Sequence, residues 1–154
     1  MCYEPFIPAE QHQTPIKMNN LQVLMQYEAI TVEVHKELNF LKATWHKQPT
    51  SDVFRKYILE ITDYALENGI TIALFDVRQR GYMEFGDQNW SMKEIFPRLQ
   101  GKVKKLAYLI NLKNLQHMDT IRLKESIANS PLLTKEFQIE LFLEHEEALK
   151  WLQE

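Results

Sequence analysis

Cysteine and glycine are both scarce in this chain of 154 residues. Cys2 is the single cysteine, so no internal disulfide can form, and no CxxC, HxxxH or HExxH motif offers a metal site. Only four glycines occur, and the sequence contains neither a glycine-rich phosphate loop nor a GxSxG nucleophile elbow. These absences predict a protein that is not an enzyme, holds no metal or cofactor and works in a reducing cytoplasm.

Long apolar runs and an excess of basic residues are missing as well. No apolar run approaches the roughly 20 residues that a bilayer span needs, and the N-terminus lacks the charged-then-apolar layout of a signal peptide. The net charge of −3 supplies no basic field for a phosphate backbone. We therefore expect neither a transmembrane segment nor a nucleic-acid partner.

Proline is concentrated near the N-terminus, where Pro5, Pro8 and Pro15 stand among polar residues. This composition predicts a flexible N-terminal extension over residues 1–19, with a strap across a partner chain as the alternative. From residue 20 onward, no linker, repeat or low-complexity segment interrupts the chain. Residues 20–154 are long enough for a single domain with a hydrophobic core.

Hydrophobic periodicity defines the expected strands and helices. Apolar residues alternate over residues 21–27, 30–34 and 40–46, and a turn at Glu37–Asn39 predicts that the last two of these strands pair antiparallel. Nearly continuous apolarity over residues 70–77 is typical of a central strand covered on both faces. Further strands are expected over 104–111 and 136–142, and helices over 50–69, 87–99, 114–130 and 145–154. This order predicts an α/β domain with helices on both faces of a mixed sheet.

Local signals mark the ends of the first two helices. Thr50 or Ser51 can cap the first helix with its hydroxyl group. In the second helix, Asp87 is the expected start, and the segment beginning at Ser91 fits a capping box one turn later. Pro97 should then end or kink that helix, because proline lacks a backbone N–H.

Several short motifs follow one another in a recognisable order. They are Trp45, Phe54-Arg55, Asp76, Asp87–Trp90, Glu94–Pro97 and Glu146–Leu152. Together they resemble the SpoIIAA-like family of small bacterial proteins, in a branch common in Bacteroidetes, over residues 28–154. The resemblance implies a STAS-like sheet of about four or five strands flanked by helices. That fold is more distantly similar to CRAL-TRIO lipid-transfer domains.

The resemblance also implies a function in protein binding and a way to regulate it. In the STAS-like antagonists, a serine at the start of the helix after the central strand is phosphorylated to control partner binding. The matching stretch here, Gly86–Trp90, holds no serine or threonine, and Ser91 lies about one turn further on. Phosphorylation of Ser91 is one interpretation, and a capping hydroxyl is the preferred one. The implied function is therefore a surface that binds a protein partner, without the phosphoswitch.

Three charged residues lie at or just after the end of the predicted central strand, at the edge where open α/β sheets place their ligand crevice. Asp76 is interpreted as a structural hydrogen-bond acceptor, with a ligand contact and a general base as the alternatives. On an extended loop, Arg78 and Arg80 would point the same way and could bind an anion. The alternative is that the nearby Glu84 and Asp87 neutralise them. Asp76, Arg78 and Arg80 are thus the candidate ligand-binding residues.

The next part of this loop is unusually apolar, because it contains Tyr82, Met83 and Phe85. Such a loop should be covered by its own domain or by another chain, and an exposed Trp90 would anchor a partner. We predict contact with another protein, or with a second copy of the chain, over the loop at residues 78–90 and the start of its helix. The predicted contact residues are Arg78, Arg80, Tyr82, Phe85, Asp87 and Trp90.

Two other functions are kept as alternatives. The first is a carrier of a small apolar or lipid-like ligand, which would use a shallow cleft because a chain of this size must fill its own core at close-packed density. In that case Arg78 or Arg80 would hold an anionic head group. The second alternative is a small enzyme that uses Asp76.

Overall fold

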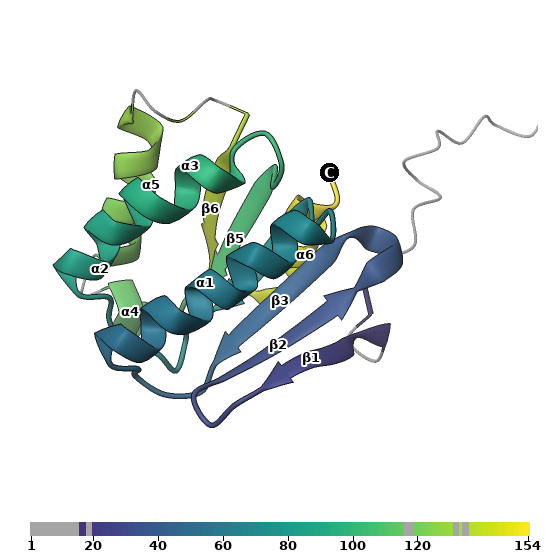
Figure 1. The fold of residues 1–154 in the computed structure, drawn as a ribbon, viewed down its shortest axis with the longest axis horizontal. Coiled ribbons are helices and arrows are strands. Elements are labelled where there is room, and N and C mark those ends of the chain that lie inside the picture. The colour runs from purple at the N-terminus through teal and green to yellow at the C-terminus, as the bar shows by residue number, and fades with distance from the viewer. Residues whose placement is uncertain (1–15, 18–19, 116–118, 131–132, 134–135) are drawn as a thin grey trace, which may run out of the picture.

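The computed structural model describes residues 16–17, 20–115, 119–130, 133 and 136–154. Six strands form one mixed sheet whose spatial order follows the chain (Figure 1). They are β1 (Gln22–Gln26), β2 (Ile30–His35), β3 (Phe40–Trp45), β4 (Ile72–Asp76), β5 (Lys105–Leu109) and β6 (Gln138–Phe142). β1 to β3 pair antiparallel, whereas β3 to β6 pair parallel. The predicted mixed α/β sheet is confirmed, with six strands in place of the four or five that the resemblance implied.

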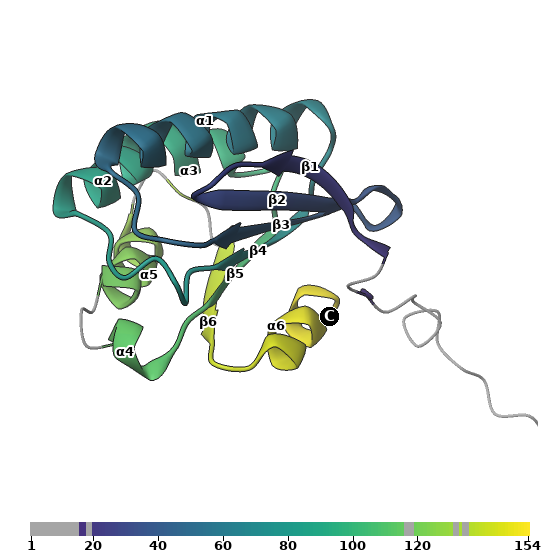
Figure 2. The same ribbon diagram turned by 90° about the horizontal axis from the view of Figure 1, so that it is seen from below.

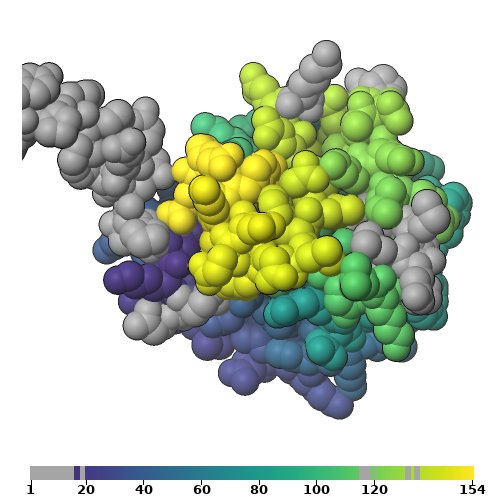
Figure 3. Space-filling model, turned by 180° about the vertical axis from the view of Figure 1, so that it is seen from behind, coloured from purple at the N-terminus to yellow at the C-terminus, as the bar shows by residue number. Residues whose placement is uncertain are grey.

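Helices cover both faces of the sheet, as predicted. They are η3 (Lys36–Leu38), α1 (Ser51–Glu67), α2 (Phe85–Trp90), the π-helical turn η4 (Ser91–Ile95), α3 (Phe96–Leu99), α4 (Leu112–Leu115), α5 (Asp119–Asn129) and α6 (His145–Leu152). α1, α2, α3 and α5 lie over one face, and α6 packs on the other (Figures 1 and 2). Figure 3 views the molecule from the α6 side, with α6 and β6 in yellow over much of this face.

Strand alternation divides the core into two halves. In β3, Leu41 and Ala43 belong to the cluster under α1, whereas Phe40 belongs to the cluster under α6. β4 lies between two parallel neighbours, and its Ala73 and Leu74 are buried on opposite faces. The continuous apolarity of this strand therefore has the predicted cause, because both of its faces are covered.

The first helix begins as predicted and the second does not. Thr50 precedes α1, and its side chain accepts a hydrogen bond from the Val53 N–H at 3.3 Å. The second helix begins at Phe85 instead of Asp87. Ser91 is buried within it, and its N–H bonds the carbonyl groups one turn earlier, so the predicted capping role is wrong. The chain then passes through η4 into α3, with Pro97 in the first turn of α3, where its missing N–H is tolerated.

The predicted N-terminal extension falls mostly outside the described residues, namely at 1–15 and 18–19, and stays a prediction. Within it, Ile16 is buried in the cluster under α6, and its N–H donates to Oε1 of Gln153 at 3.3 Å. Within the described residues, none of the helices combines the length and apolarity that crossing a membrane would require.

Candidate functional site

The turn after β4 sends Arg78 and Arg80 to opposite sides of the sheet. The Arg80 N–H donates to the Val77 carbonyl at 3.1 Å, so the chain turns here and is not extended. Arg78 is exposed and pairs with Asp76, whose strand neighbour Leu109 faces α6. Arg80 is buried on the α1 side. The expectation that the two arginines point the same way is therefore wrong.

Asp76 is held by Arg78. The Nε and Nη2 atoms of Arg78 donate to the two carboxylate oxygens at 3.0 and 2.8 Å, and the Arg78 backbone N–H donates at 3.2 Å. Burial alone would raise the pKa of Asp76, but the hydrogen bonds and charge of Arg78 outweigh it and lower the pKa below its ordinary value. A paired, ionised carboxylate suits the structural interpretation better than a general base, which works best with a pKa near the working pH.

Two more titratable groups lie near Asp76 on the α6 face. Nζ of Lys42 lies 3.4 Å from Nε2 of His145, the first residue of α6. Burial lowers the pKa of Lys42, although the negative charge of Asp76 opposes the change. Burial and the charge of Lys42 likewise lower the pKa of His145. These contacts tie the start of α6 to β3.

Asp87 and Trp90 are engaged inside the domain. The Asp87 carboxylate is buried and accepts from Nε of Arg55 and Oγ of Ser51, each at 2.8 Å. The Arg55 guanidinium lies 5.3 Å from the centre of the Trp90 ring, which also meets Phe54 edge-on. Asp87 therefore pairs with Arg55 and not with Arg78, and its charge also acts on the buried Arg80. Asp87 is thus buried in the domain, whereas Trp90 is half-buried and keeps part of its surface open to a partner.

Side chains from distant elements fix the backbone of this loop. Gln48 bonds Tyr82 twice, accepting from its N–H at 2.9 Å and donating to its carbonyl at 2.8 Å. Gln88 donates to the Met83 carbonyl at 3.0 Å, and Asp119 accepts from the Met83 N–H. Gly81 has a φ of +87°, and a Cβ there would lie 2.9 Å from Oε1 of Gln48. The loop is thus held in one conformation.

The apolar residues of the loop divide into a buried one and two exposed ones. Met83 is buried in the domain's own core. Tyr82 and Phe85 keep 45% and 64% of their surface exposed. They border a shallow groove that Glu84, Gln88 and Arg122 also line. The domain itself therefore covers only part of the apolar loop.

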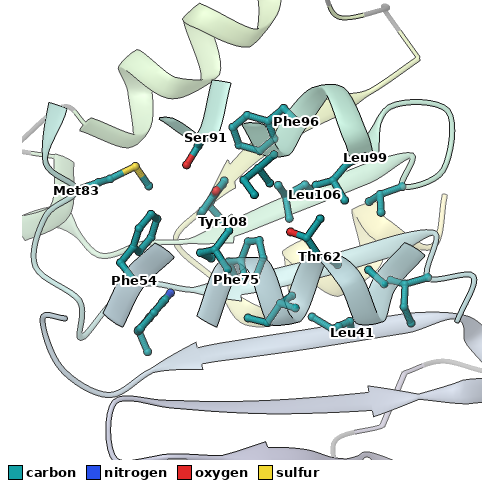
Figure 4. A pocket seen from close by; sticks show the side chains of 18 of the residues that line it. Leu41, Phe54, Thr62, Phe75, Met83, Ser91, Phe96, Leu99, Leu106 and Tyr108 are labelled. Atoms are coloured by element: carbon teal, nitrogen blue, oxygen red, sulfur yellow. The ribbon is translucent and has the colours of Figure 1, made fainter. Parts of the chain in front are cut away.

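A small apolar cavity lies behind the loop, between the sheet, α1 and the helix formed by η4 and α3 (Figure 4). Its volume is about 40 Å³. Its walls are mainly aliphatic and aromatic, and its polar lining includes Arg80, Ser91 and Tyr108. Burial raises the pKa of Tyr108 to about 12, so its phenol stays uncharged at neutral pH.

Arg80 is the unusual member of the cavity wall. It is 3% exposed, and its Nε has no hydrogen-bond partner. Its Nη2 lies 3.9 Å from a carboxylate oxygen of Asp119, and its guanidinium lies 5.9 Å from the centre of the Phe54 ring. Burial lowers the pKa of Arg80, and the nearby Tyr108 and Asp119 oppose this change. Sequence reasoning missed Asp119 and Tyr108, since both lie in ordinary helix and strand patterns far from the loop.

Comparisons with known proteins add no assignment. No known protein-family model matches the sequence, and no curated protein matches it. The resemblance to the SpoIIAA-like family therefore stays a prediction. Across the residues that the structure covers, no group of three or more histidine, cysteine or acidic side chains is placed to hold a metal ion.

Proposed function

We propose that this chain is a non-enzymatic cytoplasmic binding domain that docks a protein partner through the β4–α2 loop. The observation that carries the proposal is the exposure of Tyr82 and Phe85 on a loop whose backbone is fixed. Aromatic side chains bury much surface with few rotatable bonds, and they dominate the energetics of many interfaces. A loop that is already ordered loses little conformational entropy when a partner binds.

The surroundings of the two aromatic side chains support the same proposal. The shallow groove beside them gives a partner side chain a place to enter. Glu84 and Arg122 border this groove, so an apolar centre has a charged rim, which is the usual composition of a protein interface. The partner is another protein or a second copy of the chain.

Matched surface variants test the docking surface. Phe85→Ser and Tyr82→Ser remove exposed apolar area, and Leu59→Ser on α1, where Leu59 is 39% exposed, is the control. Sedimentation velocity over a range of concentrations measures self-association. Quantitative affinity purification, with wild type and the three variants side by side, measures other partners. We expect only the two loop variants to lose the interaction. All three variants should keep the urea midpoint of unfolding of the wild type. An interaction that survives both loop substitutions would contradict the proposal.

The apolar cavity favours a small-ligand carrier as a second candidate function. It is lined mainly by apolar side chains and includes a few polar groups, which is the usual composition of small-molecule sites. Native mass spectrometry of freshly purified protein tests this candidate. A retained small molecule supports it, and a clean mass of the chain alone after gentle handling counts against it.

A further inference from the structure

Among the buried side-chain nitrogen and oxygen atoms of the described residues, Nε of Arg80 alone lacks a hydrogen-bond partner. Leaving a buried donor without an acceptor is costly, so such atoms are rare and call for an explanation. Arg80 lines the apolar cavity, where a bound molecule could supply the missing acceptor. A ligand in the cavity would therefore give Nε of Arg80 the hydrogen-bond acceptor that the described residues do not provide.

The charge of Arg80 indicates what kind of acceptor fits. A carboxylate of the protein, Asp119, already lies 3.9 Å from Nη2 of Arg80, and both side chains are almost fully buried. A ligand carboxylate would place a second negative charge beside Asp119 in a poorly hydrated site, which is unfavourable. An uncharged oxygen accepts from Nε–H without that cost. The site thus fits a neutral acceptor better than the anionic head group expected from the sequence.

The rest of the cavity limits the size and polarity of the ligand. Its volume of about 40 Å³ has room for about three water molecules, because one water molecule needs roughly 10–15 Å³ of such space. The side chains of Ser91 and Tyr108 approach it from the helix side and the sheet side (Figure 4). Most of the remaining wall is apolar, so the carbon chain of a ligand would lie against aliphatic and aromatic groups.

We propose that the cavity binds a small uncharged carbonyl compound, whose oxygen accepts a hydrogen bond from Nε of Arg80 and whose short carbon chain lies against the apolar wall. This inference rests on the second candidate function, the carrier, and is independent of the docking surface. Three probes of nearly equal shape test the role of the carbonyl oxygen and the role of ligand charge separately. They are 2-butanone, 2-methyl-1-butene, which replaces the carbonyl oxygen with a methylene group, and propanoate, which replaces a methyl group with a charged oxygen.

The test is a titration of the full chain with each probe, followed by methyl NMR shifts of leucine and isoleucine side chains. We expect 2-butanone to bind more tightly than propanoate. In Arg80→Met, the affinity ratio of 2-butanone to 2-methyl-1-butene should fall about tenfold or more, as expected for the loss of a hydrogen bond to a charged group. Arg98→Met, which alters an exposed arginine paired with Asp63, is the matched control and should leave the ratio unchanged.

A second measurement needs only the wild-type chain, in case Arg80→Met does not fold. The ¹³C signal of carbonyl-labelled 2-butanone bound to the chain should lie downfield of its position in hexane, because a strong donor polarises the carbonyl group. A bound signal at the position seen in hexane, an unchanged ratio in Arg80→Met, or tighter binding of propanoate would each overturn the inference. If 2-methyl-1-butene binds while the ratio is unchanged in Arg80→Met, the carrier function is supported and the carbonyl inference is wrong. If no probe binds, the carrier function and the carbonyl inference are both wrong.

Discussion

Asp87→Ala is expected to destabilise the domain by about 2–3 kcal/mol, because Asp87 joins the starts of α1 and α2. The Asp87 carboxylate receives two charge-assisted hydrogen bonds, each worth about 1.5–3 kcal/mol when buried. The Arg55 side chain is 40% exposed, so its share is discounted to about 1 kcal/mol or less. The loss is further limited because Arg55 can be rehydrated and Ser51 already reaches Glu84 at 2.9 Å.

Urea unfolding at pH 7 measures this change. With a slope of about 1–3 kcal/mol per molar urea, the midpoint should fall by roughly 0.7–3 M while the slope stays constant. Asp87→Asn keeps the size and one acceptor oxygen, so it should lose about half as much. A double-mutant cycle with Arg55→Met then isolates the pair. A loss below about 0.5 kcal/mol in Asp87→Ala would refute this account, because an exposed surface substitution has the same effect.

Two further predictions concern titratable groups on the α6 face. The pKa of Asp76 is lowered in the folded state, so its contribution to stability is present above its unfolded pKa and is lost as the pH falls through the folded pKa. Arg78→Ala should therefore cost about 1–2 kcal/mol at pH 7, a value discounted for the 43% exposed arginine side chain. The difference from wild type should shrink below about pH 4, and urea midpoints at pH 7 and 3 that differ equally would contradict it. For His145, burial and the charge of Lys42 lower the pKa, so Lys42→Met should raise it towards 6.5. NMR titration of the imidazole ring checks this, and an unchanged midpoint would show that Lys42 has no influence.

Most of the fold could be predicted because its determinants are local. The side chains of β2 and β3 alternate between two environments, and Asn39 lies in the left-handed region at the turn between them. The Thr50 hydroxyl lies within one turn of the N–H that it caps. Such patterns depend on residues that are close in the sequence, and the tertiary packing here stabilises the same strands, turn and cap.

The second helix shows where local patterns fail. Ser91 followed by Glu94 matches a capping box, yet the helix begins earlier, at Phe85. Asp87 is drawn towards α1 by Arg55, a residue far from it in the sequence. Ser91 therefore lies in the middle of the helical segment, and its side chain lines the cavity. A local motif was overridden by a tertiary contact that no short window of sequence contains.

The sequence by itself determined the order of strands and helices and placed an apolar, arginine-containing loop after the central strand. Only the tertiary structure decided what each loop residue does. Arg78 and Arg80 are separated by one residue, but a turn sends one to Asp76 and the other into the core beside Asp119. The physical reason is that burial and pairing depend on which distant elements pack around a side chain. The same packing buries Met83 and leaves Phe85 exposed.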